Sequence, residues 1–128
     1  MSEILMIALA GALGTLARHG LSGWTYGILG ERFPWGTLAV NVLGCLGIGL
    51  IMEIALGSDR IPREWRIALT VGFLGGFTTF STFAYETVRA LHDGDWRTAA
   101  LNVASNVALC LGATWIGWAA GRTLTGGS

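Results

Sequence analysis

Four long apolar runs dominate the pattern of hydrophobic and polar positions along the chain. A helix that crosses a membrane needs about 20 mostly apolar residues, and the runs of that length are 4–26, 35–56, 65–91 and 98–120. The segments between them hold most of the charge, and Pro34 and Pro62 each stand just before a run begins. A proline costs a helix little at that position. The pattern predicts an all-α membrane protein whose four transmembrane helices form a single domain, 1–128.

The residues that flank the runs agree with a membrane setting. Trp24, Trp35, Trp65 and Trp96 lie near the ends of the predicted helices, where an interfacial aromatic belt is expected. No Lys or Arg precedes the first run. We therefore expect that run to be a permanent helix and not a cleaved signal peptide.

Composition excludes several classes of protein. Hydrophobic residues make up 52% of the 128 positions and charged residues 12%, whereas soluble domains carry about a quarter charged residues. The net charge is zero and no basic stripe exists, so we expect no nucleic-acid partner. The sequence offers no nucleophile triad, metal-ligand cluster or phosphate loop, which indicates that the protein is not an enzyme. Cys45 and Cys110 fall inside apolar runs, and we expect buried thiols there in preference to a disulfide.

Arginine placement bears on orientation, because the side of the membrane with more Lys and Arg usually faces the cytoplasm. With four spans, both termini lie on one side. That side would hold Arg60, Arg63, Arg66 and Arg122, and the other Arg32, Arg89, Arg97 and, if it reaches the interface, Arg18. This balance favours insertion in both orientations, which would allow an antiparallel dual-topology homodimer. The alternative is a weak bias that so small a count hides.

Glycine is abundant, with 20 residues. Several recur at helix-packing spacing, namely Gly44 with Gly49, Gly72 with Gly76, and Gly117 with Gly121. Small residues let helices approach closely in lipid. Four helices packed so tightly leave no room for a pore inside one chain, so any pore is expected between subunits.

The centre of the third run is a poor helix former. Residues 72–83 read Gly-Phe-Leu-Gly-Gly-Phe-Thr-Thr-Phe-Ser-Thr-Phe, and glycines and β-branched threonines weaken helix propensity. A break here would free carbonyl and amide groups at bilayer depth. Carbonyls suit a hard cation, and the N-terminus of a half-helix attracts an anion. The alternative is a glycine-rich packing face whose hydroxyls bond back to their own helix.

Two other runs carry polar residues four positions apart, which places each set on one helix face. The sets are Thr37, Asn41 and Cys45, and Asn102, Asn106, Cys110 and Thr114. Asparagine is costly in hydrocarbon without hydrogen-bond partners. Each set, or polar stripe, therefore either bonds neighbouring helices together or lines a pathway. Neutral donors suit an ion that must be desolvated but not trapped.

Few charged residues fall within the runs. Arg18 is deep enough in the first run to need a carboxylate, a carbonyl or water. Glu53 and Glu86 lie near the ends of the second and third runs, where each either pairs with an arginine or sits at the interface. His19 lies near a boundary and receives no role.

Residues 72–83 followed by Glu86 resemble the signature of the Fluc family of bacterial fluoride channels. Residues 35–41, Trp-Gly-Thr-Leu-Ala-Val-Asn, and 11–18, Gly-Ala-Leu-Gly-Thr-Leu-Ala-Arg, add to the resemblance, which covers the whole chain. It implies a passive fluoride channel in the bacterial inner (plasma) membrane. It also implies an antiparallel dual-topology homodimer with two pores, whose partners are fluoride, sodium and membrane lipid.

The resemblance further implies roles for individual residues. The third helix would be broken near its centre, and the carbonyls of Gly75 and Thr78 from both subunits would hold a structural Na⁺. A valine at position 75 should resist the non-helical backbone that this site requires, and the Thr79 side chain should matter less. Phe80 and Phe83 would offer ring edges to the anion, whose path comprises Asn41, Phe80, Phe83, Ser81, Thr82, Thr37, Asn102 and Asn106. Arg18 and Glu86 would be structural or vestibule charges.

The fourth helix departs from the family pattern. Members often carry Tyr, Ser or Thr where this chain has Asn102, Asn106 and Cys110. The track stays polar, but its hydrogen-bond donors differ.

Two other functions compete. A small dual-topology, proton-coupled multidrug transporter would need a carboxylate embedded in the membrane, and Glu53 and Glu86 lie too near helix ends to suit that role. A non-transporting membrane subunit would not need two polar stripes. Passive fluoride flux, as opposed to proton-coupled cation export, separates these possibilities.

Overall fold

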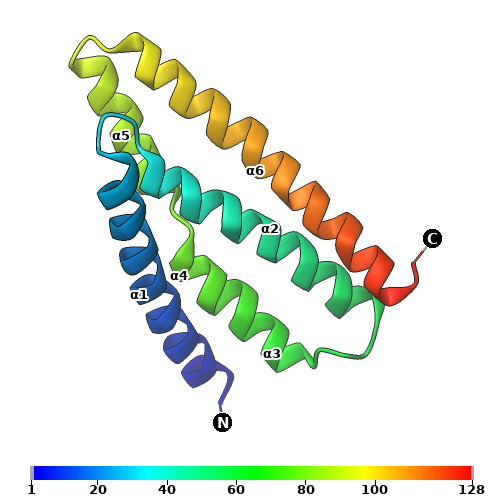
Figure 1. The fold of residues 1–128 in the computed structure, drawn as a ribbon. Coiled ribbons are helices and arrows are strands. Elements are labelled where there is room, and N and C mark those ends of the chain that lie inside the picture. The colour runs from blue at the N-terminus through cyan, green and yellow to red at the C-terminus, as the bar shows by residue number, and fades with distance from the viewer. Residues whose placement is uncertain (1, 128) are drawn as a thin grey trace.

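The computed structural model describes residues 2–127, and every regular element in that part of the chain is a helix (Figure 1). The elements are α1 (Glu3–Leu29), α2 (Trp35–Gly57), α3 (Arg63–Ile67), the π-helix η1 (Ala68–Leu74), α4 (Gly75–Phe77), α5 (Phe80–His92) and α6 (Trp96–Thr125). Four stretches are long and apolar enough to cross a membrane: Glu3–Leu29, Trp35–Gly57, Arg63–His92 and Trp96–Thr125. The four predicted spans are therefore confirmed, and each begins and ends within a few residues of its expected limits.

The helix ends follow ordinary capping chemistry. The Ser2 hydroxyl accepts a hydrogen bond from the Leu5 amide (3.2 Å) at the start of α1. Asp95 caps α6 by accepting from the Thr98 amide (3.1 Å) and hydroxyl (2.7 Å), and these bonds lower the pKa of the Asp95 carboxyl. Gly126, at φ 71°, ends α6 in the left-handed conformation that glycine adopts readily.

α2 and α6 run side by side in the same direction (Figure 1). Glycines allow this approach, because a Cβ added at Gly49 would overlap the Thr114 carbonyl and one at Gly117 would overlap the Leu46 carbonyl. A Cβ at Gly121 would lie 2.7 Å from the Glu53 Cβ. The predicted glycine contacts are therefore present along this interface.

α1 packs in a similar way on the first half of the third span. A Cβ at Gly76 would lie 2.6 Å from the Gly11 carbonyl oxygen, and one at Gly72 would lie 2.8 Å from the Ala10 Cβ. Gly44 on α2 faces the Thr78 side chain just as closely. Close backbone approach thus holds α1, α2 and the third span together.

The molecule buries few large side chains and exposes many. Val40, Leu74 and Phe77 form a small buried cluster, whereas Trp24 and Trp96 are largely exposed, as an interfacial belt requires. Such a distribution fits a protein whose apolar exterior faces lipid. Cys45 and Cys110 are free thiols, and both are half-buried where the sequence predicts burial.

The helix of the third span is interrupted at two residues. α4 ends at Phe77 and α5 begins at Phe80. Between them the backbone is extended, with φ −88° and ψ 160° at Thr78 and φ −150° and ψ 114° at Thr79. Figure 1 shows this short connection beside α2.

Candidate functional site

Asn41 on α2 binds both backbone groups of Thr79. The Thr79 amide donates to Asn41 Oδ1 (2.8 Å), and Asn41 Nδ2 donates to the Thr79 carbonyl (3.0 Å). Thr79 is buried, and a backbone group at bilayer depth needs a partner in the protein or in a water-lined cavity. The carboxamide therefore acts as the hydrogen-bonding partner that an extended residue would find in a neighbouring strand.

The Thr79 side chain starts α5. Its hydroxyl oxygen accepts from the Thr82 amide (3.1 Å), and the hydroxyl donates to Thr82 Oγ1 (2.9 Å). This is an N-cap, and it places the positive end of a new helix inside the span. The expectation that the Thr79 side chain matters less than the Gly75 backbone did not include this cap. Threonine is a common N-cap residue, and Thr79 directly precedes α5.

These two interactions release two carbonyl oxygens. In a continuous α-helix the Thr79 amide would bond to the Gly75 carbonyl, and the Thr82 amide to the Thr78 carbonyl. Both amides donate instead to side-chain oxygens, of Asn41 and of Thr79. The carbonyls of Gly75 and Thr78, the pair that the family resemblance indicates, thus lose their helical donors.

Gly75 itself does not have the expected conformation. Its φ of −61° and ψ of −38° are helical, and a Cβ added there would meet only the Thr70 carbonyl oxygen, at 3.7 Å. The expectation of a non-helical backbone at Gly75 was wrong. The extended backbone falls at Thr78 and Thr79, because Asn41 reaches the amide of Thr79.

The asparagines form a continuous hydrogen-bonded chain between helices. Asn41 Nδ2 donates to Asn106 Oδ1 (3.2 Å), and Asn106 Nδ2 to Asn102 Oδ1 (2.9 Å). Asn102 Nδ2 donates to Thr87 Oγ1 (2.9 Å), whose hydroxyl donates to the Phe83 carbonyl (2.8 Å). Asn102 is 1% exposed and Asn106 6%. The chain joins α2, α6 and α5, and no buried side-chain polar atom of residues 2–127 lacks a partner.

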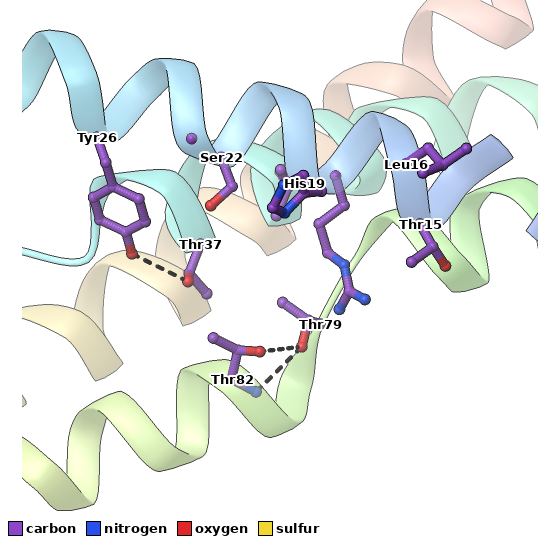
Figure 2. Close-up of a pocket in the computed structure, with 11 residues that line it drawn as sticks. Thr15, Leu16, His19, Ser22, Tyr26, Thr37, Thr79 and Thr82 are labelled. Carbon is purple, nitrogen blue, oxygen red and sulfur yellow. Dashed lines mark hydrogen bonds between the residues drawn. The ribbon is translucent and has the colours of Figure 1, made fainter. Parts of the chain in front are cut away.

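A cavity of about 570 Å³ lies between α1 and the third span, and we call it the α1 cavity. Figure 2 shows Tyr26 and Thr37 on one side of it and Thr79 and Thr82 on another. Arg18 and His19 also line it. His19, to which the sequence assigned no role, thus lines a cavity together with several hydroxyl-bearing side chains.

A smaller cavity of about 250 Å³ lies on the other side of Thr79, and we call it the phenylalanine cavity. The rings of Phe80 and Phe83 have centroids 5.4 Å apart and are tilted by 55°. Phe80 is 78% exposed. The other lining residues are Asn41, Cys45, Thr78, Thr79, Asn106, Val107 and Cys110.

Glu86 is held by hydroxyl groups and not by an arginine. The Tyr26 hydroxyl donates to Glu86 Oε2 (2.8 Å), and the Thr37 hydroxyl donates to Glu86 Oε1. Within residues 2–127 the ion pairs join Arg63 to Glu3 and Arg89 to Asp93, both on the exposed surface. Sequence reasoning missed Tyr26, because nothing near it in the sequence indicates a partner 60 positions away.

The structure divides the expected site residues into groups. Arg18, Thr37 and Thr82 line the α1 cavity, whereas Asn41, Asn106, Thr78, Phe80 and Phe83 line the phenylalanine cavity. Thr79 lines both. Asn102 is buried between helices, and Ser81 is exposed beside Thr79, with the two hydroxyl oxygens 3.5 Å apart. Glu86 joins the hydroxyls of the α1 cavity to a third cavity of about 260 Å³ near the charged helix ends.

Comparison with known proteins identifies the family. Residues 5–118 match the family model described as CrcB-like protein, Camphor Resistance (CrcB). Over 124 residues the chain is 57% identical to a protein of Geobacter metallireducens and 56% identical to one of Geobacter sulfurreducens, each match covering 97% of this chain and 100% of the relative. A Pelobacter propionicus protein is 54% identical over 127 residues, 99% of this chain and 98% of the relative.

Each of these three relatives is named fluoride-specific ion channel FluC. The expectation that the chain is not an enzyme agrees with those names. The four apolar helices make it a multi-pass membrane protein. The matches confirm the resemblance drawn from residues 72–83, and the chain belongs to the CrcB-like protein family.

Proposed function

We propose that this protein is a fluoride-selective passive channel that exports fluoride across the bacterial inner membrane. The observation that carries the proposal is the interruption at Thr78 and Thr79. It brings a helix N-terminus, two aromatic rings and an asparagine amide to one small cavity. The relatives' names support fluoride as the ion.

The phenylalanine cavity offers neutral groups that suit a small anion. The edges of the Phe80 and Phe83 rings carry the positive end of the aromatic quadrupole. The first turn of α5 presents backbone N–H groups and the positive end of the helix dipole. No carboxylate lines this cavity. An anion can therefore be desolvated there without meeting a fixed charge that would trap or repel it.

Asn41 would act by exchanging partners. Both of its N–H groups are engaged, one with the Thr79 carbonyl at 3.0 Å and one with Asn106 Oδ1 at 3.2 Å. A fluoride that binds Asn41 would replace the longer bond, to Asn106. The neutral amide chain through Asn102 would then rearrange. Such an exchange keeps the anion site weak enough for release, as conduction requires.

A structural Na⁺ fits the carbonyls of Gly75 and Thr78. Backbone carbonyls are suitable ligands for hard cations, and the helical donors of these two oxygens are diverted to Asn41 and Thr79. One chain supplies only this pair, so a second copy would complete the ligand set. The bound ion would add a fixed positive charge to the field of the site.

The assembly we propose is an antiparallel dual-topology homodimer with two pores. Gly75, Phe80, Ser81 and Thr82 are all exposed around the interruption, and lipid is a poor environment for a broken helix. A second copy placed over this surface would cover it. Two-fold symmetry would then repeat each cavity, which gives two equivalent paths. The balanced arginine count supports insertion in both orientations.

Fluoride efflux from liposomes that contain only the purified protein tests the proposal. We expect passive fluoride release well above that of protein-free liposomes, with little chloride release under the same gradient. Export of a cationic drug driven by a proton gradient, without fluoride release, would favour the multidrug transporter. Absence of any flux would favour a non-transporting subunit.

The sodium proposal needs a separate measurement. Flux and size-exclusion elution should be compared in sodium salts and in N-methylglucamine salts after exhaustive exchange. We expect loss of flux or of the dimer without sodium, and recovery when sodium returns. Unchanged flux and elution in sodium-free buffer would count against the cation but not against the channel.

A further inference from the structure

Cys45 on α2 and Cys110 on α6 have no role in the function proposed above. They are the only two cysteines of the chain. Both are half-buried and free of any disulfide. Both also line the phenylalanine cavity. Two thiols therefore meet at the edge of the region through which we expect the anion to pass.

Contacts one turn before and one turn after the cysteines set the register of α2 against α6 at this point. Asn41 and Asn106 are hydrogen-bonded at 3.2 Å, four residues before each cysteine. Gly49 lies against the Thr114 carbonyl, four residues after each cysteine. The two helices run in the same direction (Figure 1) and advance equally per residue. The packing of the two helices thus places the two cysteine positions opposite each other.

The surrounding groups limit which metal such a pair could hold. A structural zinc site needs four ligands, usually Cys, His or carboxylates. Within the described residues no group of three or more such side chains is gathered anywhere. Two opposed thiolates suit instead a soft monovalent ion such as Cu⁺ or Ag⁺, which thiolates select. The lining of the cavity includes no histidine or carboxylate that would complete a zinc site.

We propose that Cys45 and Cys110 form a two-coordinate site for a soft, thiophilic monovalent ion, Cu⁺ or Ag⁺, and that its occupation blocks fluoride passage. The blocking half of this inference rests on the proposed channel function. Binding is a ligand exchange without electron transfer. The ion forms two metal–sulfur bonds, and each thiol releases its proton to water.

Charge explains the block. One monovalent cation held by two thiolates carries a net charge of −1, where the empty pair of thiols is neutral. That charge would stand at the cavity lined by Phe80, Phe83 and Asn41. Repulsion between like charges is strong where water is scarce. Fluoride, which needs neutral or positive surroundings at this point, would be excluded.

Silver binding by the purified, full-length protein tests the site independently of transport. We expect one Ag⁺ bound per chain after desalting in nitrate buffer. Cys45→Ser and Cys110→Ser should each weaken binding by roughly 100-fold or more, because each removes one of two ligands. The double variant measures any background from methionines. Unchanged affinity in either single variant would mean that the thiols react separately, which would overturn the site.

Fluoride efflux then tests the block, with the inhibition of each protein taken relative to its own flux without silver. Ag⁺ should stop the wild type, and dithiothreitol should restore it. The single variants should resist the same concentration, and Zn²⁺ should have no effect. Silver that binds through both thiols but leaves wild-type flux unchanged would overturn the block. A protein that binds silver as described yet conducts no fluoride would refute the channel and leave the metal site standing.

Discussion

The Asn41 carboxamide pairs with both backbone groups of Thr79, at 2.8 Å and 3.0 Å, and so determines where the third span stops being helical. A side chain on α2 thereby controls the backbone of another span. The same pairing diverts the amide that would otherwise bond to the Gly75 carbonyl. The cation ligands and the anion cavity of our proposal thus depend on one residue.

Replacing Asn41 should therefore affect both transport and stability. Asn41→Ala removes all three hydrogen bonds of the carboxamide, and leaving the Thr79 groups without partners should cost about 1–3 kcal/mol. Asn41→Asp keeps an acceptor for the Thr79 amide but adds a negative charge beside the anion path. We expect severe loss of fluoride efflux in both variants.

The measurements are fluoride efflux from liposomes and thermal unfolding in detergent. Thr123→Ala is a suitable control, because the Thr123 hydroxyl only donates to the Ala120 carbonyl of its own helix (2.7 Å). Near-normal efflux in both Asn41 variants would mean that the amide is not on the path.

The two rings of the phenylalanine cavity provide a second prediction. Phe80→Ile and Phe83→Ile should each cut fluoride efflux severely while the dimer still forms, because an aliphatic group has no positive ring edge. Phe80 is 78% exposed in the single chain, so its replacement should disturb the subunit little. Size-exclusion elution checks the dimer.

Phe33→Ile serves as the matched control for these variants. Phe33 packs on Trp35, with ring centroids 4.7 Å apart, and lies in the connection between α1 and α2. The Phe33→Ile variant should transport fluoride normally. If both variants at the cavity transport as well as this control, the rings serve only packing.

Neighbouring glycines provide a third prediction. Gly76→Ala would bring a Cβ within 2.6 Å of the Gly11 carbonyl oxygen. Such overpacking should lower the free energy of unfolding by about 1–3 kcal/mol. Gly75→Ala has room within the subunit. We expect Gly76→Ala to lower the thermal midpoint measured by circular dichroism, and Gly75→Ala to leave it nearly unchanged.

Gly75→Val distinguishes an effect on the folding of one subunit from an effect on its assembly. Gly75 is exposed and helical, so the variant should still fold as a single chain. It should lose the dimer or its flux if Gly75 faces a partner across the sodium site. A fully active dimer in this variant would place the interface elsewhere.

The Thr79 cap provides a fourth prediction. Thr79→Val keeps the shape of the side chain but removes the oxygen that accepts from the Thr82 amide. Loss of an N-cap costs about 1 kcal/mol, and we expect a lower thermal midpoint together with reduced flux. Thr79→Ser retains the hydroxyl and should recover most of both. Equal stability of the valine and serine variants would argue against the cap.

Orientation in the membrane provides a fifth prediction. Cysteines placed singly at Asp59 and Asp93, in a chain with both native cysteines changed to serine, should each be labelled from both sides of the membrane. Lysines added to one connection should force one orientation, and two oppositely biased variants should then be needed together for activity. Labelling of each position from a single side would contradict dual topology.

Much of the fold follows from local properties of the sequence. Span length and hydropathy depend only on consecutive residues, and for this reason the four helices begin and end close to their predicted limits. The glycine contacts at Gly49, Gly72 and Gly117 were also predictable. A position without a side chain in a membrane helix usually marks a place where another backbone approaches.

The site depended more on tertiary structure. The sequence identified Glu86 and Thr37 as polar residues but did not pair them, and it gave no role to Tyr26, which lies 60 positions from Glu86. It also grouped Thr82 with the fourth-helix asparagines, which line a different cavity or none. Periodicity tells which residues share a face of one helix, but not which helix that face meets.

The sequence alone determined four spanning helices, their glycine contacts and a weak point near the middle of the third, because each is a property of residues close together in the chain. Only the tertiary structure decided that the extended backbone lies at Thr78 and Thr79 while Gly75 stays helical. The physical reason is that Asn41, 38 positions away in the sequence, approaches closely enough to bond with Thr79 in place of the helix.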